Sequence, residues 1–202
     1  MPNRNRLAER REATRREILD AAWEIARAQG LGAVTLREVA SRVGMQSPSL
    51  YSHFESKNAI FDAMFGQAWS DYLAVGEALD GQLPTAARKA LLMLAQNFVD
   101  FCVADLARFQ LMNLRVIADF EPTPESYAPS LRVMELLHVH MAELGIVKEA
   151  DIDLFAAVVG GLIDGQFANE PGGRRYIGQL DRAMDMFADH VGLPGPRLRR
   201  AR

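Results

Sequence analysis

The sequence predicts an all-α protein with a three-helix unit at its N terminus and a larger helical domain after it. Apolar residues recur at helical spacing along most of the 202 residues, and no segment alternates between apolar and polar residues as strands do. Helix-starting and helix-ending residues divide this pattern into separate helices. The predicted domains are a basic flexible arm (1–11), the three-helix unit (12–72), the larger domain (73–193) and an Arg-rich disordered tail (194–202).

The first predicted helix begins at a capping box formed by Thr14 and Glu17 and ends at Gly30. Its apolar residues lie on one stripe, on which two shorter helices can pack. The stripe consists of Ile18, Ala21, Ala22, Ile25 and Ala26.

The two shorter helices are predicted between residues 35 and 54. Thr35 and Glu38 form a second capping box, and Leu36, Val39, Ala40 and Val43 follow at helical spacing. Gly44 stands where a helix favours a left-handed residue after its last turn. Ser47 and Pro48 then restart the chain as an N-cap and a first helical residue, and the new helix runs to Phe54. This arrangement is typical of a helix-turn-helix, whose second helix enters the major groove of DNA.

Lys57 follows as the first residue of the next predicted helix, which Ser56 caps. An ammonium group beside free backbone N–H groups at a helix start favours an anion such as a phosphate. The charge distribution agrees with this, since residues 1–57 carry 10 Lys or Arg against 7 Asp or Glu. Residues 58–202 carry 13 against 19. A basic head on an acidic body is typical of a protein with one end directed at a polyanion.

Each of these features also has a structural interpretation. Two capped helices around a glycine turn occur in all-α proteins that bind no nucleic acid, and short basic termini are common. The residues alone therefore leave open a helical hairpin without DNA binding.

The combination of motifs, however, resembles a known family. Residues 12–72, above all TLREVASRVGMQSPSLYSHFESKNAIFDAMF, are similar to the N-terminal domain of the tetracycline-repressor (TetR) family of bacterial regulators. The shared pattern is the Thr-led helix, the glycine turn, Leu50-Tyr51, His53-Phe54 and Lys57. The resemblance implies a homodimeric, cytoplasmic transcription regulator without enzymatic activity. It further implies a repressor that a small apolar effector releases from a pseudo-palindromic operator.

The resemblance also implies roles for nine residues. Tyr51, His53, Lys57 and the Thr35 end of its helix are expected to contact backbone phosphates. Arg37, Gln46, Ser47 and Ser49 are expected near base edges, and Pro48 near apolar groove atoms such as a thymine methyl. Many relatives carry Gly or Thr in place of Pro48, so their operator sequences do not transfer to this chain.

The larger domain is predicted to contain five helices, which are approximately 84–103, 106–118, 123–144, 151–169 and 173–190, after a connecting helix over 57–79. The third of them, 123–144, is expected to break near Pro129 if it breaks at all. Soft and aromatic side chains gather here and suit a pocket for an apolar ligand, although for each one alone ordinary core is the favoured interpretation. The candidate effector residues are Met64, Phe98, Phe101, Met112, Met134, His138, Met141 and Phe155.

The last two predicted helices have apolar residues on more than one face, and glycines in 151–169 would let another backbone approach closely. We therefore expect a four-helix bundle between two copies of the chain, with an intrachain core as the alternative. The candidate interface residues are Phe155, Val158, Val159, Gly161, Leu162, Ile163, Gly165, Met184 and Phe187.

Metal, cofactor and membrane functions find little support in the sequence. Glu135 and His138 are spaced like metal ligands on a helix, but no second such pair exists for a di-metal site, so no metal or cofactor is expected. The longest apolar run, Leu154 to Ile163, is too short to cross a bilayer, and no signal peptide is expected. Single Cys102 suits a reducing compartment. Two alternatives remain. The first is a helical dimer that binds another protein and does not bind DNA, and the second, less favoured, is an all-α metal-dependent enzyme.

Overall fold

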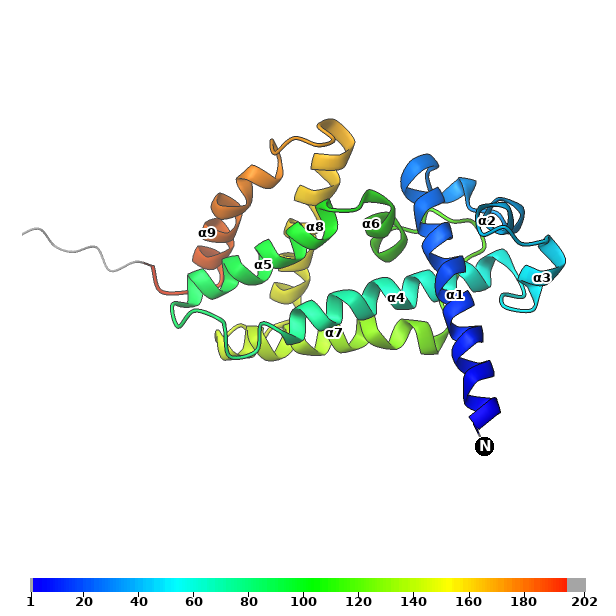
Figure 1. Cartoon of the computed structure of the whole chain (residues 1–202). Helices are drawn as coiled ribbons and strands as arrows, with labels where there is room; N and C mark the ends of the chain where they lie inside the picture. The colour runs from blue at the N-terminus through cyan, green and yellow to red at the C-terminus, as the bar shows by residue number, and fades with distance from the viewer. Residues whose placement is uncertain (1, 196–202) are drawn as a thin grey trace, which may run out of the picture. The chain divides into compact units, whose positions relative to one another are not determined.

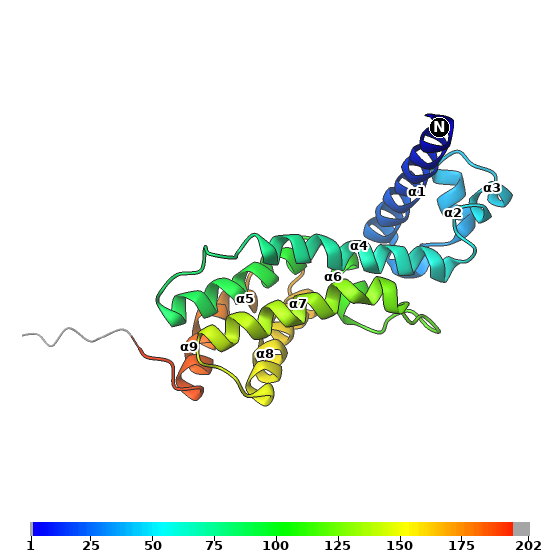
Figure 2. The same ribbon diagram turned by 90° about the horizontal axis from the view of Figure 1, so that it is seen from below.

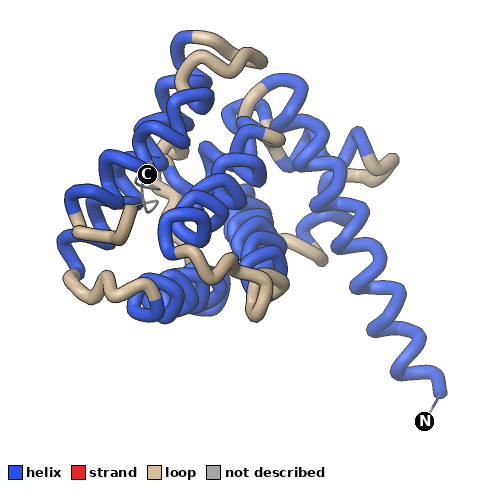
Figure 3. The backbone as a smooth tube through the Cα atoms, turned by 90° about the vertical axis from the view of Figure 1, so that its left-hand side faces the viewer, coloured by secondary structure: helices blue, strands red, loops and turns tan. Residues whose placement is uncertain are grey.

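The structure is a computed structural model that describes the backbone of residues 2–195 and the side chains of residues 6–195. This part of the chain consists of helices joined by loops and turns and contains no strand (Figures 1 and 3), which confirms the predicted fold class. The α-helices are α1 (Pro2–Gln29), α2 (Leu36–Arg42), α3 (Ser47–Tyr51), α4 (Lys57–Glu77), α5 (Ala87–Val103), α6 (Leu106–Asn113), α7 (Pro124–Glu143), α8 (Glu149–Asn169) and α9 (Leu180–His190). Short 3-10 helices cover Leu31–Ala33 and Ile177–Gln179. Apart from its first two residues, the predicted tail (194–202) lies outside the described residues.

The chain forms two compact units. Unit 1 consists of the residues up to Asp71 together with Asp105–Ser130, and unit 2 consists of Tyr72–Ala104 together with the residues from Leu131 onward. The first boundary lies one residue from the predicted one. Residues 105–130, which the sequence analysis assigned to the larger domain, instead group with unit 1, because helical periodicity does not reveal which distant helix a segment packs on.

Helix α1 is longer than predicted. It begins at Pro2, so that Thr14 lies inside the helix and the predicted flexible arm is helical from residue 2 on. The residues between Pro2 and Thr14 are largely Arg, Glu, Ala and Leu, which have high helix propensity, and no further Gly or Pro interrupts them. The predicted stripe from Ile18 to Ala26 is buried within unit 1.

The predicted turn between α2 and α3 is present, and α2 packs on both α1 and α3 (Figure 2). Thr35 Oγ1 accepts a hydrogen bond from the Glu38 amide at 3.1 Å, and Gly44 takes the left-handed conformation with φ +68°. The predicted cap of α3 was wrong by one residue. The Gln46 carbonyl already accepts from the Ser49 amide at 2.9 Å, so Gln46 is the cap residue and Ser47 begins the helix.

Four further boundaries differ from the prediction by three residues or more. Helix α3 ends at Tyr51 rather than Phe54, and α5 begins at Ala87 rather than Pro84. Helix α6 ends at Asn113 rather than Ala118, and α9 begins at Leu180 rather than Gly173. The segment before α9 is held in turns instead, where the Glu170 carboxylate accepts from the Arg175 amide at 2.8 Å. Pro129 lies inside α7 without ending it.

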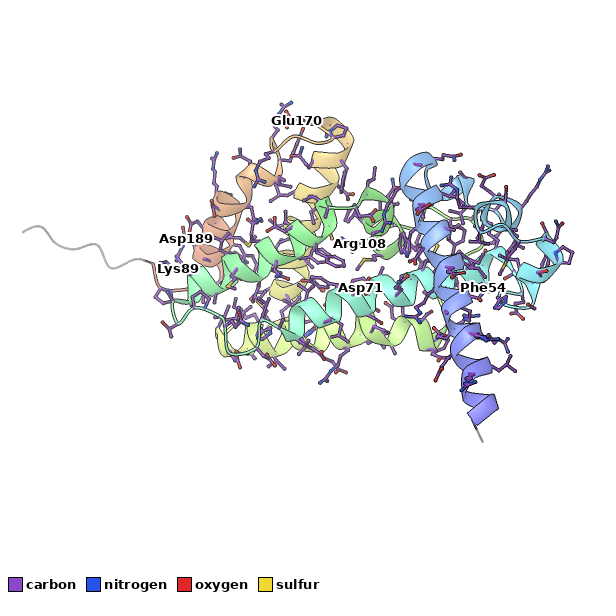
Figure 4. The ribbon with its side chains drawn as sticks, viewed as in Figure 1. Phe54, Asp71, Lys89, Arg108, Glu170 and Asp189 are labelled. Atoms are coloured by element: carbon purple, nitrogen blue, oxygen red, sulfur yellow. The ribbon has the colours of Figure 1, made fainter. Side chains whose placement is uncertain are left out.

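In unit 2, α5, α8 and α9 pack on one another. The rings of Phe155 on α8 and Phe187 on α9 have centroids 5.7 Å apart. Arg88 on α5 holds the segment that follows α9, because its guanidinium donates to the carbonyls of Leu193 and Pro194. It also pairs with Asp189 of α9, which Figure 4 labels. These three helices of one chain therefore build part of the core of unit 2, to which α7 adds the fully buried Met141.

Candidate nucleic-acid interface

The nine predicted DNA contacts lie on accessible parts of unit 1. Thr35, Arg37, Gln46, Pro48, Ser49 and Tyr51 are exposed, and Ser47, His53 and Lys57 are half-buried. Tyr51 is 54% exposed, so its side chain is accessible from the surface of unit 1. All nine residues come from α2, the turn, α3 and the start of α4.

Helix α3 divides its side chains as the sequence predicts. Leu50 has no exposed surface, and Phe54 just beyond the helix is 2% exposed. These two apolar side chains anchor the segment to the core of unit 1. The anchors leave Pro48, Ser49 and Tyr51 directed away from the core, where they are accessible to a ligand as large as a DNA duplex.

His53 offers one ring nitrogen for a phosphate. Its Nδ1 atom is buried and has no hydrogen-bond partner within the described residues. The backbone carbonyl of His53 accepts a hydrogen bond from Arg15 of α1. A contact between this side chain and DNA would therefore use Nε2.

Lys57 is the first residue of α4, as predicted. Ser56 Oγ accepts from the Ala59 amide at 3.0 Å, which satisfies one of the free amides of this helix start. The Lys57 Nζ atom lies 5.1 Å from the centre of the Phe61 ring one turn further on. The ammonium group thus stays over the first turn of α4, beside the positive end of the helix dipole.

The eight predicted effector residues are divided between the two units. Met64 and Met112 belong to unit 1, and the other six belong to unit 2. Met64 and Met141 are fully buried, whereas Met134 is 36% exposed and His138 lies at the surface of α7. Phe155 serves the α8–α9 core described above. Spacing along a helix shows which face a residue occupies, but not whether that face meets a cavity.

A cavity does exist in unit 1, with a volume of about 220 Å³. Met112 is the predicted effector residue that lines it. Its aromatic wall is formed by Phe65, Tyr127 and Phe120; the rings of Phe65 and Tyr127 are stacked with centroids 6.0 Å apart. Arg115 and Glu121 add charge to the lining, and the remaining lining residues are Leu111, Asn113, Leu114, Ile117 and Pro122. The sequence signal for this wall is the spacing of Phe120 and Tyr127 in FEPTPESY, residues 120–127.

The predicted dimer residues fall into two groups. Five of them are buried inside unit 2, and for these the prediction was wrong: Phe155, Val159, Ile163, Met184 and Phe187. Helix α8 has apolar residues on two faces, and one of these faces packs on helices of its own chain. Val158, Gly161 and Leu162 remain at least partly exposed on the other face, next to Leu154, which is 42% exposed.

The glycine at position 165 is also explained by packing within one chain. A Cβ atom at this position would lie 2.7 Å from the Tyr176 ring, so the close approach that glycine permits is made by a side chain of the same unit. Gly160 and Gly161, by contrast, have open space around them. Gly161 leaves a smooth strip on the outer face of α8, whereas Gly160 lies about 100° further around the helix and not on that face.

The Glu135–His138 pair does not form a metal site. Glu135 pairs with Arg132 at 2.8 Å, and the Nε2 atom of His138 faces Glu149 at 3.0 Å. Within the part of the chain that the structure describes, no group of three His, Cys, Asp or Glu side chains is placed to hold a metal ion. No single helix in that part is long and apolar enough to cross a membrane, although α5 and α6 taken together pass by length and composition.

His138 is expected to make unit 2 more stable at low pH. Its pKa is raised above the ordinary value because the protonated ring donates to the Met134 carbonyl and faces the Glu149 carboxylate. A raised pKa contributes stability below the unfolded value of about 6.5, and the contribution is lost as the pH rises through the folded value. Urea unfolding should therefore show His138→Gln to be destabilising at pH 5.5, by no more than about 1 kcal/mol for so exposed a pair, and nearly neutral at pH 8. Equal effects at both pH values would contradict the pairing, and Glu149→Gln should reduce the pH dependence in the same way.

Known proteins resemble both the interface and the fold. Residues 18–64 match the family described as "Bacterial regulatory proteins, tetR family". The tetracycline repressor protein class D of Escherichia coli is 36% identical over 50 residues, which is 25% of this chain and 23% of that protein. The HTH-type transcriptional repressor KstR2 of Rhodococcus jostii is 31% identical over 101 residues, which is 48% of each chain. The chain thus matches about a quarter to a half of the length of these relatives.

The fold as a whole also has solved counterparts. The transcriptional regulator FadR of Bacillus subtilis, crystallised in complex with stearoyl-CoA, has a TM-score of 0.68 at 14% identity, over 85% of this chain and 96% of that one. Such low identity shows a shared fold alone. The matched segment 18–64 contains all nine predicted DNA contacts and the helices that hold them. With the sequence relatives, this match places residues 18–64 of the chain in the tetR family of bacterial regulatory proteins.

Proposed function

We propose that this protein is a homodimeric transcriptional repressor that binds a pseudo-palindromic operator and releases it when a small apolar effector binds. The observation that carries the proposal is the accessible polar surface of α3 and the starts of α2 and α4, in a segment that matches a family of bacterial regulators. Its parts are DNA binding, dimerisation and effector response, and each rests on different residues.

DNA binding rests on how the polar groups are distributed. Thr35 and Lys57 stand at the starts of two helices, where free amides and the helix dipole favour phosphate. Gln46 and Ser49 lie at the exposed start of α3, with side chains able to hydrogen-bond to base edges. Phosphate contacts would set the position of the protein, and the α3 contacts would select the sequence.

Dimerisation rests on the outer face of α8. The apolar side chains of Leu154, Val158 and Leu162 are exposed or half-buried there, and Gly161 between them has open space. Met186 on α9 is 64% exposed. An apolar face with a smooth glycine strip supports an isologous contact with a second copy, as in a four-helix bundle. Two copies would present two α3 helices to successive major grooves.

The effector response rests on the cavity of unit 1 and its link to α4. The segment that forms one wall, residues 113–122, is joined to α4 by hydrogen bonds. Asn58 donates to the Asp119 carbonyl at 2.9 Å, and the Asp62 carboxylate accepts from the Thr123 amide at 2.7 Å. Asn58 is the neighbour of Lys57. A ligand that moves this wall would therefore shift the start of α4, and with it the phosphate contacts.

Selection of bound DNA from a random pool tests the DNA-binding part of the proposal. We expect enrichment of a palindrome with half-sites about one helical turn apart, or a multiple of it. A pool that yields no palindrome would overturn the proposed function. Repeating the binding with toluene, a small apolar aromatic molecule, tests the effector part. Toluene should lower the affinity for the selected DNA, and unchanged affinity would contradict a small apolar aromatic effector in this cavity.

Lys57→Ala should weaken binding to every DNA sequence by a similar factor. Removing one phosphate contact should lower the slope of log K against log salt by about one unit, because one fewer counterion is released. Fluorescence anisotropy across a salt series measures both quantities. Lys89→Ala, in unit 2, is the matched control and should leave the slope unchanged. An unchanged slope in Lys57→Ala would remove this residue from the phosphate contacts.

A further inference from the structure

Helix α3 is too short to hold its own geometry. It contains five residues. A single turn of helix is unstable in water, because the conformational entropy lost in nucleation outweighs the hydrogen bonds that one turn forms. Leu50 and Phe54 bury one side of the segment, but they do not hold the backbone carbonyls at its end. Contacts at that end can therefore add to what Leu50 and Phe54 contribute to the orientation of α3 relative to α1.

Two arginines of α1 make these contacts. Arg15 Nη1 donates to the His53 carbonyl, and Arg11 Nη2 donates to the Ser52 carbonyl at 3.2 Å. The Arg15 guanidinium also lies over the Phe54 ring, with its central carbon 4.0 Å from the ring centre (Figure 4 labels Phe54). Cation–π stacking and a charged hydrogen bond thus act on two consecutive residues.

The spacing of these arginines matches the geometry. Arg11 and Arg15 are four residues apart, so they lie one turn apart on the same face of α1. Arg10 and Arg16, their neighbours, are exposed. Arg15 is half-buried, and its position over Phe54 directs its charge toward the loop rather than outward.

We propose that Arg15 is a positioning residue for DNA recognition. It fixes the C-terminal end of α3 and thereby the direction of Ser49 and Tyr51, and it does not itself contact a phosphate. The basic residues of unit 1 then have two separate roles. Lys57 contacts a phosphate, whereas Arg15 holds α3 in the orientation that recognition requires. The part of this inference that concerns recognition rests on the proposed function, whereas the part that concerns α3 does not.

Hydrogen exchange of the free protein tests the effect on α3. The amides of His53 and Phe54 are bonded to the Leu50 carbonyl at 2.9 and 3.0 Å, and they report the order of this turn. In Arg15→Ala their exchange should quicken at least about tenfold, as expected for loss of a charged hydrogen bond, while amides of α2 keep the wild-type rate. Arg16→Ala removes the same charge one residue away and should change neither. Unchanged exchange of His53 and Phe54 in Arg15→Ala would overturn the inference.

Anisotropy with two duplexes tests the effect on recognition, using the selected operator and an unrelated duplex of equal length. Relative to Arg16→Ala, Arg15→Ala should lose about tenfold more affinity for the operator, while the affinity for unrelated DNA and the salt slope match those of Arg16→Ala. An equal loss for both duplexes with a slope lower by about one unit would make Arg15 a phosphate contact and overturn the inference. Behaviour identical to Arg16→Ala would also overturn it.

A third variant keeps the test decisive if Arg15→Ala does not fold. Arg15→Lys retains the charge and a donor for the His53 carbonyl but loses the planar stack on Phe54. It should lose part of the preference for the operator and show intermediate exchange, and wild-type values in both measurements would overturn the inference. If the wild-type protein enriches no DNA, the proposed function fails, and the exchange experiment still decides whether Arg15 holds α3.

Discussion

Leu154→Asp should convert the protein from a dimer into a monomer and lower its affinity for a two-half-site operator by about a hundredfold or more. Leu154 is 42% exposed on the outer face of α8, so aspartate there costs the isolated chain little. In a dimer the carboxylate would be buried in an apolar contact without a partner. A monomer has one α3 helix and binds one half-site at a time, so the gain in affinity from binding both half-sites at once is lost. Sedimentation velocity and anisotropy measure the two effects.

Val147→Asp is the matched control for this variant. Val147 is an apolar residue of unit 2 that is 75% exposed and lies between α7 and α8, away from the outer face of α8. It should remain a dimer with wild-type affinity. A dimeric Leu154→Asp protein would show that this face is not the interface.

Leu50→Ala should destabilise unit 1 by about 2–5 kcal/mol and abolish specific DNA binding. Leu50 has no exposed surface, and it is the buried anchor within the five residues of α3. Truncation leaves a cavity under a helix that has few other contacts to hold it. Urea unfolding followed by circular dichroism measures the loss of stability, and anisotropy measures the loss of binding.

Leu50→Met tests whether the volume of the buried side chain at this position is what stabilises α3. A flexible side chain of similar volume should cost less than about 1.5 kcal/mol and retain operator binding. A loss below about 1 kcal/mol in Leu50→Ala would mean that α3 relaxes into the space, and that Leu50 does not anchor it.

The local parts of the interface could be predicted from the sequence because each depends on neighbouring residues. The Thr35 cap requires a hydroxyl three residues before an amide, and the Gly44 turn requires a residue that tolerates positive φ. The start of α4 at Lys57 follows from the Ser56 hydroxyl in the same way. The cap of α3 was wrong by one residue, because serine, proline and glutamine in sequence allow two starting positions.

The effector residues could not be predicted in this way. Met64, Met134 and Met141 have similar chemistry, yet two of them are fully buried and one is at the surface. Whether a side chain lines a cavity depends on which distant segment leaves a gap beside it. The wall made by Phe65 and Tyr127 joins residues 62 positions apart in the chain, and no periodicity relates them.

By itself the sequence determined the helical fold, the helix-turn-helix and the accessible polar surface of the head, because these follow from capping, periodicity and the exclusion of water from apolar faces. Only the tertiary structure decided which of the two apolar faces of α8 is the core of its own chain, since both look alike in sequence. It also decided the task of Arg15. A basic side chain on an N-terminal helix has the same pattern whether it meets phosphate or a backbone carbonyl, and only the packing of α1 against the end of α3 distinguishes the two.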